Sequence, residues 1–245
     1  MDEFSRTRLL LGEEPIEKLK KSTVAVFGIG GVGGYTVEAL ARSGVGKLVL
    51  VDNDTVSLTN INRQIIALHS TVGRYKTEVM RERILDINPN AQVEIHTCFF
   101  LPENAAQFDF SKYDYVVDAV DTVTAKIEII MQAKAAGVPV ISAMGAGNKL
   151  DAAKFVVTDI YKTQMCPLAK VMRKELRNRG VDKLKVVYSE EPALTPKEIT
   201  ERENCDREVQ ENTARRSTPG SIAYVPSVAG LLLAQEVIKD IISAG

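Results

Sequence analysis

The chain has 245 residues, 45% of them hydrophobic, which is enough for one large α/β domain with a substantial core. Lysine and arginine total 31 against 32 acidic residues, so the net charge of -1 gives no general case for nucleic acid, and any basic surface must be local. The three cysteines, Cys98, Cys166 and Cys205, form no CxxC pair, which argues against a disulfide framework and a structural zinc site. We expect a single domain, 1–245, in a reducing cytoplasm.

Two apolar stretches resemble membrane or export signals in part, but neither predicts stable membrane insertion. The three-leucine run near the N-terminus lies between charges and is too short for a signal peptide. Residues 221–242 are apolar, but Pro226 interrupts them and charged side chains close them. A buried helix is therefore favoured there over a membrane anchor.

Short β-branched runs alternate with helical patterns through the first part of the chain. The runs are 23–28, 48–52, 93–97, 115–121 and 138–143. The helical patterns between them end at Gly44, before Pro89 and at Gly137, where glycine or proline should stop a helix. Four of the five runs are apolar almost throughout, as in parallel strands covered on both faces. We predict a doubly wound, mostly parallel, Rossmann-like α/β sheet.

The second part of the chain predicts a less regular C-terminal extension. Residues 155–159 form a strand pattern, and a helix is expected to begin near Pro167, which suits a first helical position. Residues 189–220 are polar, charged and proline-bearing, with no sustained apolar period. We interpret them as a mobile loop within the domain.

A glycine-rich turn follows the first run and opens a helix. Gly28, Gly30 and Gly33 satisfy GxGxxG, and Gly31 makes the turn richer. Glycine lets the backbone approach a ligand, and a helix beginning near Val32 would direct its N–H groups toward phosphate. The alternative is that the glycines serve only tight packing of strand against helix.

Asp52 ends the second run, where a carboxylate can accept both hydroxyls of a ribose. This suits NAD and ATP equally. The chain has neither a P-loop nor a YxxxK pair, and its only histidines are His69 and His96, so hydride-transfer machinery is hard to assemble.

Polar residues beyond Asp52 favour a triphosphate. Arg63 offers a rigid fork of donors for phosphate oxygens, and Asn60 and Gln64 add uncharged donors beside it. Lys76 supplies a second cation, and Asp121 ends the fourth run, at the carboxyl edge of the sheet, as a candidate Mg²⁺ ligand. Arg63 or Lys76 alone could be solvated surface. Together with the glycine turn and two strand-end aspartates, they indicate nucleotidyl transfer.

The motifs at 28–34, 52–64, 72–76 and 118–126 resemble those of the adenylyltransferase superfamily of ubiquitin-activating enzymes and the bacterial relatives that adenylate ThiS- or MoaD-type proteins. Order, spacing and chemistry agree over 4–145. The resemblance implies that ATP and Mg²⁺ are bound, with Asp121 as the metal ligand and Arg63, Lys76, Asp121 and Arg6 as catalytic residues. The residues that it implies for ATP are Gly28, Gly30, Gly31, Gly33, Asp52, Asp54, Asn60, Arg63, Gln64, Lys76, Asp121 and Thr122.

The resemblance also has consequences for partners. Arg6, in a segment similar to the family's N-terminal helix, would reach the γ-phosphate of a neighbouring subunit, which implies a homodimer. Residues 158–242 are similar to the branch of the superfamily that dehydrates threonylcarbamoyl-adenosine in tRNA. That branch uses ATP to form a carboxyl-adenylate and then a ring, giving AMP and pyrophosphate.

Two alternatives stay open from the sequence. The chain could adenylate the C-terminal carboxylate of a ubiquitin-like sulfur carrier, although the paired CxxC motifs usual in those enzymes are absent. Cys205 could then accept sulfur or form a thioester with a partner protein. An NAD-dependent oxidoreductase or nucleotide sensor is the third hypothesis. A tRNA substrate would need a basic surface, for which 170–185, with seven basic against two acidic residues, and Arg215 and Arg216 are candidates, unless they form a solvated face.

Overall fold

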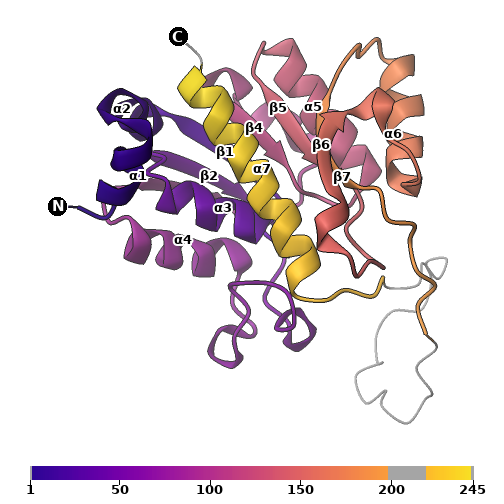
Figure 1. Ribbon diagram of the computed structural model, residues 1–245, viewed down its shortest axis with the longest axis horizontal. Coiled ribbons are helices and arrows are strands. Elements are labelled where there is room, and N and C mark those ends of the chain that lie inside the picture. The colour runs from indigo at the N-terminus through magenta and orange to yellow at the C-terminus, as the bar shows by residue number, and fades with distance from the viewer. Residues whose placement is uncertain (1, 198–218, 244–245) are drawn as a thin grey trace.

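All strands of the computed structural model belong to one seven-stranded sheet, and the structure describes residues 2–197 and 219–243 (Figure 1). The strand order is β3-β2-β1-β4-β5-β7-β6. Every pairing is parallel except that of β6 with β7. The strands are β1 (Thr23–Phe27), β2 (Lys47–Val51), β3 (Gln92–His96), β4 (Tyr115–Asp118), β5 (Val140–Ala143), β6 (Phe155–Asp159) and β7 (Lys185–Ser189). The predicted doubly wound, mostly parallel sheet is confirmed.

Seven α-helices of the described part of the chain surround this sheet. They are α1 (Ser5–Leu11), α2 (Glu13–Lys21), α3 (Gly33–Arg42), α4 (Lys76–Ile87), α5 (Val123–Ala135), α6 (Pro167–Asn178) and α7 (Tyr224–Ser243). Short 3-10 turns lie at Leu58–Asn60, His69–Thr71, Pro102–Gln107, Phe110–Lys112, Ala152–Lys154 and Ile160–Lys162. Within the described residues, no helix is long and apolar enough to cross a membrane.

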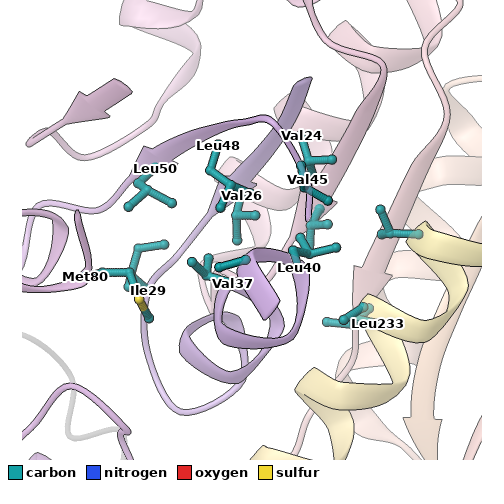
Figure 2. Packing of buried hydrophobic residues seen from close by; sticks show 14 of the residues in the cluster. Val24, Val26, Ile29, Val37, Leu40, Val45, Leu48, Leu50, Met80 and Leu233 are labelled. Carbon is teal, nitrogen blue, oxygen red and sulfur yellow. The ribbon is translucent and has the colours of Figure 1, made fainter. Parts of the chain in front are cut away.

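The core has two layers because strand side chains alternate between the faces of the sheet. On one face, Val24 and Val26 of β1 pack with residues of α3, α4 and α7. Figure 2 shows this layer, with Val37 of α3 and Leu233 of α7 close to the strands. On the other face, Phe27 packs against the aromatic residues of 100–113 and the apolar sides of α5 and α6. Both faces of the central strands are thus covered, which explains their continuous apolar sequences.

Three features of the C-terminal part refine the prediction. The strand at 155–159 and the helix from Pro167 are confirmed as β6 and α6. A strand that the sequence reading missed, β7, pairs in parallel with β5 and antiparallel with β6. The prediction that Pro226 interrupts the apolar stretch is wrong. Pro226 lies in the first turn of α7, where a missing N–H costs no helical hydrogen bond. Most of the loop predicted at 189–220 lies outside the described residues.

Candidate active site

A cavity of about 550 Å³ opens at the carboxyl ends of the central strands. The strand order reverses here, because β1 has β2 as its neighbour on one edge and β4 on the other. Ligands of doubly wound sheets bind at such a switch point. The cavity brings together most of the predicted site residues, which are Gly28, Gly30, Gly31, Asp52, Asp54, Asn60, Arg63, Gln64, Lys76, Asp121 and Thr122. Gly33 and Arg6 do not line it.

The glycines of the turn after β1 have different structural roles. At Gly33, a Cβ atom would lie 1.8 Å from the Gly28 carbonyl oxygen, and at Gly28 it would lie 2.7 Å from that of Ala119. Gly28 also has a φ of 89°, which favours glycine. At Gly30, by contrast, the nearest atom to a Cβ would be Gln64 Nε2 at 3.9 Å. The fold therefore requires glycine at positions 28 and 33, whereas the absence of a side chain at Gly30 keeps a wall of the cavity open.

Asp52 connects the end of β2 to the glycine turn. One carboxylate oxygen accepts the Ile29 N–H at 2.6 Å, and the other accepts the Asp54 N–H at 2.8 Å. Burial raises the pKa of Asp52, and the positive charge of Lys76 opposes that rise. Each carboxylate oxygen keeps a further lone pair, so the group can still accept hydrogen bonds from a ligand in the cavity.

Lys76 begins α4 and is held in an ion pair. Its side chain is buried, and Nζ lies 2.7 Å from Asp54 Oδ2. Its backbone N–H donates to the Asp54 carbonyl, so both groups of Lys76 are fixed to the same residue. The sequence reading expected Lys76 to turn toward phosphates, and in this structure it faces Asp54 at the cavity.

Arg63 lines the cavity, and among the described residues its side chain is hydrogen-bonded only to neutral groups. Its Nη1 donates to the Thr59 carbonyl and to Asn62 Oδ1, each at 3.0 Å. No ion pair of Arg63 occurs within 2–197 and 219–243. An anion in the cavity could therefore bind Arg63 without displacing a carboxylate.

The two predicted amides beside Arg63 differ in how they are bound. Asn60 Oδ1 accepts the Ser57 N–H at 3.1 Å, which closes the turn that carries Arg63. Gln64 is buried, and its Oε1 atom has no hydrogen-bond partner among the residues described. A buried oxygen without a donor is costly unless a ligand or water supplies one. A ligand that satisfies this oxygen must offer a donor such as a hydroxyl group, whereas the Gln64 amide nitrogen can donate to phosphate.

The strand-end carboxylate of β4 is Asp118 and not Asp121, which corrects the sequence reading. Asp118 is fully buried, 3.0 Å from Lys126 Nζ, and accepts the Ser142 hydroxyl at 2.5 Å. Asp121 lies in the following loop, exposed on the cavity, with a 3.3 Å contact from the Thr122 hydroxyl. Asp121 has no cationic partner in the part of the chain that the structure describes.

Lys126 does not line the cavity but holds the loop after β4, a role that the sequence did not lead us to predict. It is fully buried in α5, and besides Asp118 its Nζ donates to the carbonyls of Val120, at 3.0 Å, and Ala143, at 2.7 Å. It thereby fixes the loop that carries Asp121. The available signal was a lysine inside the apolar helix pattern TAKIEII, since a charged residue on a buried face needs a partner.

Other residues of the cavity wall were not predicted from the sequence. Cys98 lines the cavity with Phe99 and Phe100, and burial raises the pKa of its thiol. Pro219 and Ser221 also line the cavity, close in sequence to the start of α7. Cys166 is buried, whereas Cys205, Arg215 and Arg216 lie outside the described residues.

The doubly wound sheet and the position of the cavity are those of a nucleotide-binding protein, and similarity to known proteins identifies the family. The model of the ThiF family matches residues 4–244, so the chain belongs to the ThiF family. This confirms the resemblance drawn from the motifs.

Individual proteins of this family show which members the chain closely resembles in sequence and structure. A Bacillus subtilis protein named tRNA threonylcarbamoyladenosine dehydratase is 44% identical over an alignment that covers 99% of this chain and 95% of that protein. The crystal structure of Escherichia coli tRNA N6-threonylcarbamoyladenosine dehydratase, TcdA, in complex with ATP aligns with a TM-score of 0.87 and 34% identity, covering 98% of this chain and 94% of that one. An adenylyltransferase and sulfurtransferase of Vanderwaltozyma polyspora is 39% identical over 54% of this chain.

The two glycine roles can be separated by substitution. Gly30→Ala should leave the melting temperature near that of the parent protein and weaken nucleotide binding about tenfold or more, because the added methyl group enters only the cavity. Gly33→Ala should destabilise the whole protein, since its Cβ would overlap a backbone carbonyl. Thermal unfolding and calorimetric titration with ATP measure both effects. A Gly30→Ala protein that binds ATP normally would contradict this assignment.

Proposed function

We propose that this chain uses ATP to dehydrate threonylcarbamoyl-adenosine in tRNA, closing a ring through a carboxyl-adenylate. The observation that carries the proposal is the 44% identity to a dehydratase over nearly the full length of both chains. The TcdA complex with ATP and the composition of the cavity support it. The relatives named adenylyltransferase and sulfurtransferase match only 54% of the chain, which leaves nearly half of it without support for that activity.

The cavity has groups for each part of ATP. Asp52 would accept the ribose hydroxyls, and Phe99 and Phe100 add apolar surface to the lining. The phosphate end of the cavity would be at the open backbone of Gly30 and the guanidinium of Arg63, with additional donors from Asn60, Gln64 and Lys76.

The chemistry explains why such a site suits dehydration. A carboxylate is a poor acyl donor, because its oxygen leaves with difficulty. Its attack on the α-phosphorus of ATP forms a carboxyl–phosphate bond and expels pyrophosphate. The carbamoyl nitrogen of the same substrate then attacks the acyl carbon, loses its proton and expels AMP, so one water is lost overall. The protein needs to position these groups and stabilise charge on phosphate, and no cysteine nucleophile is required.

A magnesium ion is part of this proposal. Asp121 is the residue that would hold it, because its exposed carboxylate faces the cavity without a cationic partner among the residues described. Those residues also contain no cluster of three or more His, Cys, Asp or Glu side chains that could hold a metal by themselves. Mg²⁺ commonly binds through one or two carboxylates together with substrate phosphates, and would neutralise charge on them.

A homodimer is proposed with the same site. Arg6 is exposed on α1 and does not line the cavity of its own chain, so any role at a γ-phosphate requires a second subunit. Leu9 and Leu10 on the same helix are each 86% exposed, which supports a partner on that helix. A monomeric mass in native mass spectrometry would exclude this arrangement. A separate sulfur-transfer or carrier protein as partner has no such support.

A tRNA surface is proposed on α6. Met172 and Leu176 face the core, which leaves Lys170, Lys174 and Arg177 exposed on the opposite side. A basic helix face of this kind is suited to the phosphates of RNA.

The decisive experiment is mass analysis of nucleosides from tRNA treated with the protein, ATP and Mg²⁺. Threonylcarbamoyl-adenosine should lose the mass of one water, with AMP and pyrophosphate formed in equal amounts. AMP formation stimulated by a small protein ending in Gly-Gly, and not by tRNA, would instead support the sulfur-carrier activity. Binding of NAD but not ATP would exclude both.

Arg63→Ala should lower AMP formation by about 10² or more, the usual effect of losing one preorganised charge-stabilising group. Arg74→Ala is the matched control, because Arg74 pairs with Glu82 and does not line the cavity. Comparing the rate of AMP release for the two variants tests the role. Equal activity in both would refute it.

Asp121→Asn should abolish magnesium-dependent turnover and leave thermal stability unchanged, because this carboxylate supports no ion pair in the described structure. Initial rates over a magnesium titration, together with a melting curve, measure this. A variant with the parent's magnesium dependence would show that another residue holds the metal.

A further inference from the structure

Asn62 belongs to the segment after β2, but the proposed site assigns it no role. Its side chain makes two hydrogen bonds in opposite directions. Nδ2 donates to the Ser221 carbonyl at 3.0 Å, and Oδ1 accepts from Arg63 Nη1 at 3.0 Å. A primary amide can donate to a carbonyl through its nitrogen and accept from a guanidinium through its oxygen at the same time. Asn62 therefore links Arg63 to a segment 159 residues away in sequence.

Pro219, Gly220 and Ser221 form that segment, which we call the strap. Its other end is held by Asn148, in the loop after β5. The Gly220 N–H donates to Asn148 Oδ1 at 2.6 Å, and the Asn148 N–H donates to the Gly220 carbonyl at 2.8 Å. Asn148 has a φ of 58°, in the left-handed region that asparagine tolerates better than most residues. One asparagine thus holds the strap on each side.

The strap is close to the phosphate end of the cavity. Pro219 and Ser221 line it, and Pro226, at the start of α7, would lie 3.2 Å from a Cβ at Gly31. Arg63 Cγ would lie 3.5 Å from the same point, so Arg63 is near both the glycine turn and the chain that follows the strap. The Asn148 carbonyl also accepts the Leu194 N–H at 2.8 Å, which ties a third segment to the same loop.

We propose that Asn62 and Asn148 are positioning residues, which pin the strap across the phosphate end of the cavity and hold Arg63 in the orientation that binds the ATP triphosphate. This rests on the proposed function only for its substrate, because the effect on ATP binding needs no tRNA. The strap acts through Arg63, because Asn62 is hydrogen-bonded both to Arg63 and to Ser221 of the strap.

A double-mutant cycle tests the proposal. Asn62→Ala removes both side-chain bonds, and Asn148→Gly removes the bond to Gly220 in a backbone conformation that glycine accepts. Each change should weaken ATP binding and slow AMP formation about tenfold, and the double variant should lose about as much as one single variant, because either change releases the same strap. AMP binding should stay within about twofold of the parent, since AMP lacks the phosphates that Arg63 holds.

Calorimetric affinities for ATP and AMP, the rate of AMP formation with modified tRNA, and melting curves give the required measurements. Asn90→Ala, an exposed asparagine before β3 that does not line the cavity, is the matched control and should resemble the parent. Multiplicative losses in the double variant, unchanged ATP affinity in either single variant, or parallel losses of AMP affinity and melting temperature would overturn the proposal. If the parent protein binds ATP but leaves the tRNA unchanged, the proposed substrate fails and the affinities still decide the role of the strap.

Discussion

The hydrogen bonds of the Asp52 carboxylate are the constraint on which the site depends. With its two oxygens, this one group fixes the backbone at Ile29, within the glycine turn, and at Asp54, at the start of the segment that carries Arg63. Burial raises the pKa of Asp52, and the positive charge of Lys76 and the two backbone N–H groups oppose that rise. The same interactions that shape the cavity leave Asp52 with lone pairs that can accept hydrogen bonds from a ligand.

The loop after β4 is held by a second carboxylate, that of Asp118. Unlike Asp52, Asp118 is in an ion pair that is fully buried. Asp118 and Lys126 are both fully buried, and the cost of removing two charges from water offsets much of their attraction. What the pair provides is geometry. Lys126 reaches the carbonyls of Val120 and Ala143, so it joins β5 to the loop in which Asp121 stands. Within residues 2–197 and 219–243, Asp121 has no ion pair with a cationic side chain, in contrast to Asp118.

The fold and the site could be predicted from sequence to different extents, for physical reasons. The buried parallel strands were predictable because both faces are covered and the runs are apolar throughout, whereas β7 begins with Lys185 directly after a charged segment and gave a weak signal. Gly30 and Gly33 look alike in the motif, yet only their surroundings separate the ligand-facing glycine from the packing one. The apolar run does not show whether the strand ends at Asp118 or three residues later at Asp121, so the prediction placed the strand end at the wrong aspartate. The contacts of Asn62 with Ser221 and of Asn148 with Gly220 join distant segments, and no local pattern predicts them.

The distribution of ion pairs supports the proposed binding of a metal-bound nucleotide without large rearrangement. Of the charged side chains that line the cavity, Lys76 and Asp54 are already paired with each other, and Lys126 is paired with Asp118 close by. Within the described residues, Arg63 is bound only to neutral oxygens, and Asp121 has no cationic partner. A polyanion carrying a divalent cation matches this pair of free charges, because each can bind its opposite without breaking a bridge. Preorganised charges of this kind gain the most when the reaction redistributes charge between phosphate oxygens, which is the step that adenylation requires.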